Sequence, residues 1–323
     1  MTTRPDDQDP PGYGCRTPRP PHPFRRQSPL PGERPKPDHE DPAASERVRA
    51  LIESPAYREA DSDVEFLNSA LARGPRLQLD YLKAETLLQA EGLTDAIVVF
   101  GSTRLAEPVA ARARLSAAHA ASRAAPDDAG LREKVAIAQN LLEKSKYYDI
   151  AREFGALVGG ACDCPDGRRL AIVTGGGPGA MEAANRGAFD VGAPTVGFNI
   201  SLPREQFPNP YLTPGLCFRF HYFAIRKLHL VQRARALVAF PGGYGTFDEL
   251  FETLTLVQTR KISPLPIVLV GESFWRRAFD VDFLVAEGVI DPEDRDLFWF
   301  AESARDIWGG ILGWWEKAGQ PLL

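Results

Sequence analysis

The chain has 323 residues, of which 44% are hydrophobic and 25% charged, so it can form a packed core, and a disordered or fibrous protein is excluded. Its net charge of -5 argues against a protein that mainly binds nucleic acid or an anionic membrane, because both usually require a basic surface. No apolar run is long enough to span a bilayer, and the first residues lack the core of a signal peptide. We therefore expect a soluble protein with neither nucleic-acid nor membrane partners.

The cysteines indicate the redox compartment. They are too few for a disulfide framework, and two of them are separated by one residue, where zinc knuckles and redox pairs normally have two. His221 and His229 have no carboxylate at ligand spacing on their predicted helix, so no metal site is expected. We predict a reducing, cytoplasmic location for a chain whose cysteines are Cys15, Cys162, Cys164 and Cys217.

The first part of the chain cannot form a core. Residues 1–42 hold 12 of the 28 prolines, and Phe24 and Leu30 are their only large aliphatic or benzyl side chains. We expect residues 1–43 to be a disordered, proline-rich tail. The alternative is a proline-rich ligand for a partner domain. Only short pieces such as Pro18-Arg19-Pro20 support this alternative.

Two further segments read as helical additions. Residues 44–92 place apolar side chains at helical spacing, with a break at Gly74-Pro75, and predict an N-terminal helical extension. Residues of about 105–130 are rich in alanine and arginine and predict a helical insertion.

Residues 93–323 alternate short apolar runs with helix-length segments. Continuous apolar strands alternating with helices are typical of a parallel sheet covered on both faces, so the sequence predicts a doubly wound α/β domain. The expected strands are 96–100, 170–173, 195–198, 236–240 and 266–270, and the expected helices are 132–158, 180–190, 221–234 and 246–259.

Two of the loops that follow these strands are candidate ligand sites, because ligands bind beyond the carboxyl ends of the strands in such sheets. The loop at Gly101 and Ser102 can hold a phosphate or be a plain strand-to-helix turn. The loop at 174–182 contains Gly176 and Gly177 and fits a dinucleotide fingerprint. The next strand lacks the acidic residue that would hold a ribose, which disfavours NAD.

The most specific loop is Phe240-Pro-Gly-Gly-Tyr-Gly-Thr-Phe-Asp-Glu249. Its glycines expose backbone amides, and a helix expected to begin at Thr246 would favour an anion. The alternative is structural: Thr246-x-x-Glu249 also fits a capping box, in which Glu249 only satisfies a backbone donor.

The segments 241–249 and 175–182, with Arg226-Lys227 between them, resemble the Lonely Guy (LOG) family of nucleoside 5'-monophosphate phosphoribohydrolases, often labelled lysine decarboxylases. The resemblance covers about 96–270. It implies a Rossmann-like homodimer or higher homo-oligomer without a cofactor. The implied reaction is hydrolysis of the N-glycosidic bond of a cytokinin riboside 5'-monophosphate or of AMP.

The resemblance also implies roles for individual residues. Arg226 and Glu249 would be catalytic. Asp248 departs from the family pattern, where glutamate is expected, and leaves the preferred base open. The substrate would be bound by Gly101, Ser102, Gly176, Gly177, Glu205, Lys227, Gly242, Gly243, Gly245 and Thr246.

These roles are chemically coherent. Breaking a ribosyl C–N bond builds positive charge on the sugar, which a carboxylate stabilises, and we expect Glu249 to stay ionised at a helix N-terminus. Arg226 would act electrostatically, because arginine does not lose its proton near neutral pH. The alternative for Arg226 and Lys227 is that they form a solvated helix face. The alternative for the whole protein is a nucleotide-binding function without turnover. A pyridoxal enzyme is disfavoured because neither Lys227 nor Lys261 lies in a recognisable Schiff-base setting.

Overall fold

The computed structural model describes residues 20–26, 28–161, 169–203 and 207–323. Contacts divide the chain into two units, Met1–Leu71 and Ala72–Leu323. In the first unit, the described residues before Ala44 form neither helix nor strand, and they are followed by α1 (Ala44–Glu53), a short 3-10 helix (Pro55–Tyr57) and α2 (Val64–Asn68). Among the described residues, no helix combines the length and the hydrophobicity needed to cross a bilayer.

Removal of residues 1–42 should leave the melting temperature of the protein unchanged. The described part of this segment is exposed, apart from a half-buried Asp41, so its removal takes almost no apolar contact from the rest of the chain. Differential scanning fluorimetry of the full-length and shortened chains measures the effect. A fall of several degrees would show that the segment packs.

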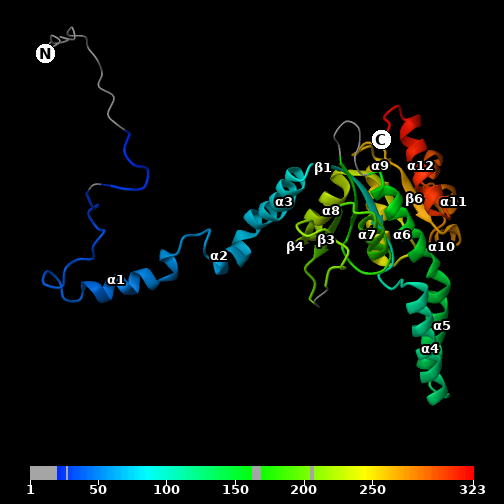
Figure 1. Ribbon diagram of the computed structural model, residues 1–323, viewed down its shortest axis with the longest axis horizontal. Coiled ribbons are helices and arrows are strands. Elements are labelled where there is room, and N and C mark those ends of the chain that lie inside the picture. The colour runs from blue at the N-terminus through cyan, green and yellow to red at the C-terminus, as the bar shows by residue number, and fades with distance from the viewer. Residues whose placement is uncertain (1–19, 27, 162–168, 204–206) are drawn as a thin grey trace, which may run out of the picture. The chain divides into compact units, whose positions relative to one another are not determined.

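The second unit is built on a seven-stranded, all-parallel sheet (Figure 1). Its strand order is β4-β3-β2-β1-β5-β6-β7, so the chain builds outward from β1 in one direction and then from β5 in the other. The doubly wound, Rossmann-like α/β prediction is confirmed. The strands are β1 (Leu93–Phe100), β2 (Arg169–Thr174), β3 (Thr195–Ile200), β4 (Cys217–Phe220), β5 (Ala234–Ala239), β6 (Ile267–Val270) and β7 (Trp299–Ala301).

All five expected strands are present, and the two that the sequence did not reveal are the edge strands β4 and β7. β4 has four residues and alternates exposed and buried positions, and β7 has three residues. Neither forms the continuous apolar run that marks the central strands, because an edge strand needs less burial than a central one. The central strands form the core: every residue of β6 is buried, and in β1 only Thr94 is exposed.

Helices cover the sheet. α6 and α7 pack closely against each other and against β2. α3 lies against α8 and β1, and therefore belongs to the sheet-containing unit. The helices of this unit are α3 (Arg73–Ala90), α4 (Pro108–Ala124), α5 (Ala129–Lys144), α6 (Lys146–Gly159), α7 (Ala180–Asp190), α8 (Phe223–Gln232), α9 (Tyr244–Gln258), α10 (Glu272–Ala278), α11 (Val281–Ala286) and α12 (Ala304–Lys317).

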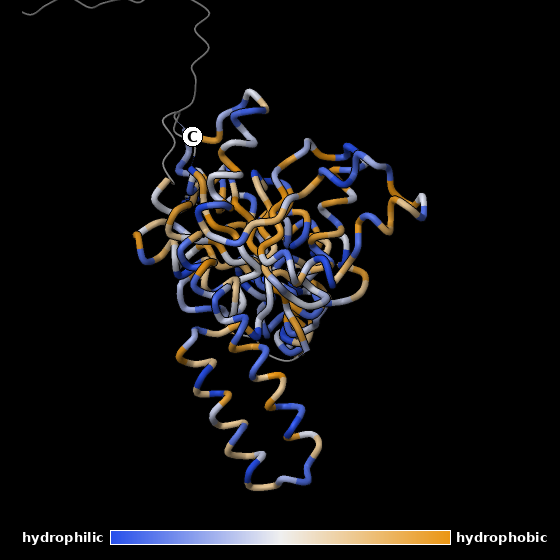
Figure 2. The backbone as a smooth tube through the Cα atoms, turned by 90° about the vertical axis from the view of Figure 1, so that its right-hand side faces the viewer, coloured by the Kyte–Doolittle hydropathy of each residue, from blue (hydrophilic) through white to orange (hydrophobic). Residues whose placement is uncertain are grey.

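α4 and α5 form an antiparallel hairpin that projects from the sheet (Figures 1 and 2). The single helix expected over 132–158 is wrong, because the chain breaks at Ser145 into α5 and α6. Ser145 donates its hydroxyl to the carbonyl of Leu142, at 2.7 Å, and so bonds backward instead of capping α6. α5 has no buried residue, and along the hairpin hydrophobic and hydrophilic residues alternate (Figure 2).

Candidate active site

Three loops meet where the strand order reverses, beyond the carboxyl ends of β1, β2 and β5. The amide of Ser102 donates to the carbonyl of Pro241 at 3.0 Å, and the amide of Ala180 donates to the carbonyl of Ser102 at 3.2 Å. The amide of Phe240 donates to the carbonyl of Phe100 at 2.8 Å. The three loops that the sequence singled out are thus joined at the switch point, where ligands of doubly wound folds bind.

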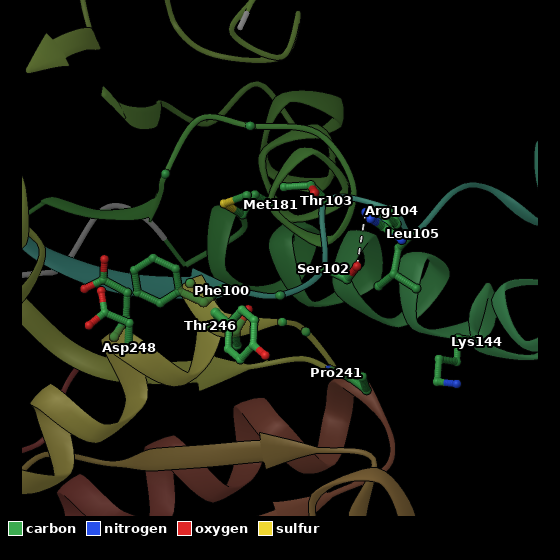
Figure 3. Close-up of a pocket in the computed structure, with 18 of the residues that line it drawn as sticks. Phe100, Ser102, Thr103, Arg104, Leu105, Lys144, Met181, Pro241, Thr246 and Asp248 are labelled. Carbon is green, nitrogen blue, oxygen red and sulfur yellow. Dashed lines mark hydrogen bonds between the residues drawn. The ribbon is translucent and has the colours of Figure 1, made fainter. Parts of the chain in front are cut away.

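These loops, together with α5, α8, α9 and α10, line a cleft of about 680 Å³ (Figure 3). Gly176 and Lys227 are not among its lining residues, and Glu205 lies outside the described residues. The predicted site residues that do line the cleft are Gly101, Ser102, Gly177, Arg226, Gly242, Gly243, Gly245, Thr246 and Glu249.

The predicted phosphate loop ends in a helix start that has no side-chain cap. α9 begins at Tyr244, with Gly243 as its N-cap, two residues earlier than expected. Thr246 is therefore inside the first turn, and its amide bonds to the carbonyl of Gly243 at 2.9 Å, so the capping-box reading is wrong. A helix N-terminus with open amides stabilises an anion, which suits a phosphate.

Gly243 offers a direct test of this loop. Its φ is -97°, which any residue can adopt, and a Cβ built on it has no atom within 4 Å. We expect Gly243→Ala to leave the melting temperature unchanged and to raise the KM for AMP about tenfold or more, because the methyl group would occupy space needed by the phosphate. Gly309→Ala, at a similarly open glycine on α12, is the control and should leave KM unchanged. An unchanged KM for Gly243→Ala would show that the phosphate binds elsewhere.

Arg226 and Glu249 form a buried ion pair across the cleft. Arg226 Nη1 lies 3.7 Å from Glu249 Oε1, and the two side chains are 12% and 5% exposed. Arg226 is oriented by its Nε, which donates to the carbonyl of Phe198 at 2.8 Å. Burial lowers the pKa of Arg226, and the charges of Glu249 and Asp248 oppose this effect. The solvated-face reading of Arg226 is therefore wrong.

Burial raises the pKa of Glu249 to about 7, against the opposing effects of the Arg226 and Lys227 charges. The expectation that the helix dipole keeps Glu249 ionised is not met. Glu249 is the sixth residue of α9, beyond the first turn in which the dipole acts, and it is removed from water. A carboxyl group with a pKa near neutrality can both accept and release a proton at physiological pH.

Lys227 faces α9. Its Nζ lies 2.8 Å from Asp248 Oδ2, 2.9 Å from Glu252 Oε2 and 3.8 Å from Glu249 Oε2. Burial lowers the pKa of Lys227, but the hydrogen bonds to Asp248 and Glu252 and the nearby charges outweigh burial and raise it. Lys227 thus joins α8 to α9, and a direct contact with substrate stays a prediction.

A buried polar network behind the glycine loop was not predicted. Thr174 Oγ1 donates to Asn185 Oδ1 at 2.8 Å and accepts from the amide of Gly176 at 2.9 Å. Asn209 Nδ2 lies 3.1 Å from the carbonyl of Gly177 and 3.0 Å from Asn185 Oδ1. Gly176 has φ +71°, a conformation that favours glycine. Gly176 therefore fixes the backbone of the loop without lining the cleft. The one feature of the sequence that could have indicated this network is a polar residue, Asn185, inside an alanine-rich helix.

The second unpredicted feature is Asp80 of α3, which caps the start of α8. Its carboxylate accepts from the amide of His221 at 3.0 Å and from that of Tyr222 at 2.9 Å, just before α8 begins at Phe223. α8 carries Arg226 one turn later. The position of Arg226 therefore depends on a residue about 140 positions earlier in the chain.

Asp80→Asn should lower kcat/KM for AMP about tenfold, because the neutral amide is a weaker acceptor for two backbone donors and α8 would lose its fixed start. The measurement is steady-state kinetics beside the melting temperature. Asp296→Asn, an exposed residue of the 3-10 helix Pro292–Leu297, is the control. Unchanged kinetics for Asp80→Asn would show that α8 keeps its position without this cap.

The described residues contain no group of three histidine, cysteine or carboxylate side chains that could hold a metal ion. Cys15, Cys162 and Cys164 lie outside the described residues. His229 is 1% exposed, stacks on Tyr81 and places its Nε2 3.1 Å from the Tyr81 carbonyl. His229 is therefore a core residue.

Known proteins match about half of this chain. A family model described as "possible lysine decarboxylase" matches residues 181–311. LOG1 of Arabidopsis thaliana, a cytokinin riboside 5'-monophosphate phosphoribohydrolase, is 30% identical over 170 residues, which cover 51% of this chain and 74% of LOG1. The chain belongs to the LOG family. The family model includes Arg226 and Glu249, and it leaves out α3 and the α4–α5 hairpin.

Two further matches differ in extent. LOG of Oryza sativa subsp. japonica, also named a cytokinin riboside 5'-monophosphate phosphoribohydrolase, is 31% identical over 170 residues, covering 51% of this chain and 65% of that protein. Among solved structures, the X-ray structure of TM1055 covers 67% of this chain and 98% of its own, with 20% identity and a TM-score of 0.41.

Proposed function

We propose that this LOG-family protein hydrolyses the N-glycosidic bond of a purine nucleoside 5'-monophosphate, either AMP or a cytokinin riboside 5'-monophosphate. The products are the free base and ribose 5-phosphate. The observation that carries the proposal is the buried pair of Arg226 and Glu249, 3.7 Å apart, in the same cleft as an uncapped helix start. This arrangement supports the proposal because one small nucleotide could contact the helix start with its phosphate and the carboxylate with its ribose.

The phosphate binds to Gly242 and Gly243 of the loop and to Gly245 and Thr246 in the first turn of α9. The ribose then extends toward Glu249, whose carboxylate stabilises the positive charge that develops as the C–N bond breaks. With a pKa near 7, Glu249 can also accept a proton from the water that attacks the sugar carbon. The oxygen of that water forms the new bond to the sugar, and the base leaves with the electron pair of the broken C–N bond. The base takes up a proton from the surrounding water, and Glu249 returns to that water the proton that it accepted, so the reaction consumes one water molecule in all.

Arg226 stabilises the negative charge on the departing base. The guanidinium stays protonated, so it acts by charge and by hydrogen bonds and not as an acid. The cleft wall next to it is apolar, with Ile200, Leu202 and Phe223, and Phe223 lies against the Arg226 guanidinium at 5.8 Å from ring centroid to Cζ. The flat face of a purine ring fits such a wall.

The test is to incubate the purified protein with AMP and, separately, with isopentenyladenosine 5'-monophosphate, and to measure the free base by chromatography. Release of adenine or isopentenyladenine in equal amount to ribose 5-phosphate is expected. If both nucleotides bind and neither releases base, the protein is a nucleotide-binding protein without turnover, and the proposal is wrong. The proposed homodimer is tested separately by sedimentation of the same preparation.

A further inference from the structure

A second cavity of about 540 Å³ adjoins the cleft, between the α5–α6 junction and α10. The two cavities share three lining residues, Asn140, Lys144 and Phe274. The roles assigned so far to the cleft make no use of this second space.

The second cavity is positively charged. Lys144, Lys146 and Arg277 line it, against one carboxylate, that of Glu143. Among the described residues, none of the three cations makes an ion pair, and Lys146 only lies over the ring of its neighbour Tyr147. Three unpaired cations around one cavity, in a chain of net charge -5, indicate an anionic ligand.

The proposed positions of the phosphate and the ribose set the direction of a nucleotide bound in the cleft. Arg104 and Lys144 lie on the side of Thr246 opposite to Asp248 (Figure 3). With the first phosphate on the loop before Thr246 and the ribose toward Glu249, any further phosphate would extend toward Lys144, which lines both cavities.

We propose that the second cavity is a phosphate subsite, so that nucleoside 5'-diphosphates and 5'-triphosphates bind with the first phosphate on the loop and the terminal phosphates among Lys144, Lys146 and Arg277. The direction of the bound nucleotide rests on the proposed function. Such nucleotides occupy the monophosphate site and therefore compete with AMP. Lys and Arg side chains around a cavity bind phosphate by charge and by charge-assisted hydrogen bonds.

The test measures binding without turnover. Isothermal titration calorimetry is performed with AMP, ADP and inorganic phosphate on the full chain carrying Glu249→Gln. We expect ADP to bind about tenfold more tightly than AMP. Adding Lys146→Gln and Arg277→Gln should weaken ADP binding about tenfold and change AMP binding less than twofold. Lys144 is left intact because it also lines the cleft.

The control removes the same charge from the hairpin. The control variant combines Lys134→Gln and Arg112→Gln, two exposed positions that line neither cavity. It should change the affinity for neither AMP nor ADP. ADP binding no tighter than AMP, or an equal loss for both nucleotides, overturns the subsite. If inorganic phosphate alone loses affinity in the double variant while ADP is no tighter than AMP, the cavity takes free phosphate and the nucleotide proposal is overturned.

The outcomes also separate this proposal from the proposed function. Adenine release by the wild-type chain, together with equal AMP and ADP affinities, overturns the subsite alone. ADP binding that depends on Lys146 and Arg277, without release of base from either monophosphate by the wild type, supports the subsite and overturns the hydrolase. Failure of AMP and ADP to bind overturns the subsite, and it overturns the hydrolase as well if the wild type releases base from neither monophosphate.

Discussion

Glu249→Gln is expected to lower the turnover of AMP about a hundredfold or more, with little change in melting temperature. The substitution removes the negative charge that faces the developing sugar cation and keeps the size and hydrogen-bonding groups of the side chain. In this variant Arg226 retains its hydrogen bond to the carbonyl of Phe198 and therefore stays in place. Adenine release and thermal unfolding, measured on the same preparation, separate the two effects.

Glu287→Gln is the matched control, because Glu287 is exposed at the end of α11. Glu252 is less suitable, since its carboxylate lies 2.9 Å from Lys227 Nζ. If Glu249→Gln keeps near-full turnover, as Glu287→Gln should, Glu249 has only a structural role.

The pH dependence gives a second readout of the same group. Glu249 ionises around pH 7, so the wild-type kcat/KM should rise as the pH increases through 7 if the carboxylate form is active. The substrate phosphate also titrates, at a pKa of about 6. In Glu249→Gln the change of kcat/KM near pH 6 should persist, while the change near pH 7 should disappear. A wild-type rate that falls through pH 7 would assign the active form to the protonated acid.

Adenosine should be hydrolysed with a kcat/KM about a thousandfold lower than that of AMP. The loop before α9 and the first turn of α9 offer backbone amides and the Thr246 hydroxyl to a dianion. Each charge-assisted hydrogen bond lost is worth roughly 1.5–3 kcal/mol. Two such bonds account for a factor of this size. Initial rates of adenine release from the two substrates provide the measurement.

Gly243→Ala supplies the matched comparison, because it should penalise AMP and leave the low rate with adenosine unchanged. Adenosine turned over as efficiently as AMP would mean that the loop does not bind a phosphate during catalysis.

The features that the sequence predicted correctly are those set by local pattern. Continuous apolar runs produced the five inner strands, and the glycine-rich loops follow directly on three of them. The features that it did not predict depend on distant residues. Asp80 reaches the amide of His221 from 141 positions away, and no spacing rule describes such a contact. The raised pKa of Glu249 likewise depends on burial, which only the assembled fold determines.

The break at Ser145 has a different cause. No glycine or proline marks it, and the segment 132–158 keeps helical spacing on both sides. Ser145 itself keeps helical backbone angles, and the break falls where the chain passes from α5, which pairs with α4, to α6, which packs on α7. Ile137, Leu141 and Lys144 of α5 consequently line a cleft that the sequence assigned to loops and to the helices after them.

The cap that Asp80 places on α8 also sets the size of the smallest useful fragment. The parallel sheet begins with β1 at Leu93, and a chain shortened to that point would retain every residue that lines the cleft. It would nevertheless lose α3 and expose the amides of His221 and Tyr222 at the start of the helix that carries Arg226. Truncation for crystallography or for activity assays should therefore begin no later than Arg73, where α3 starts.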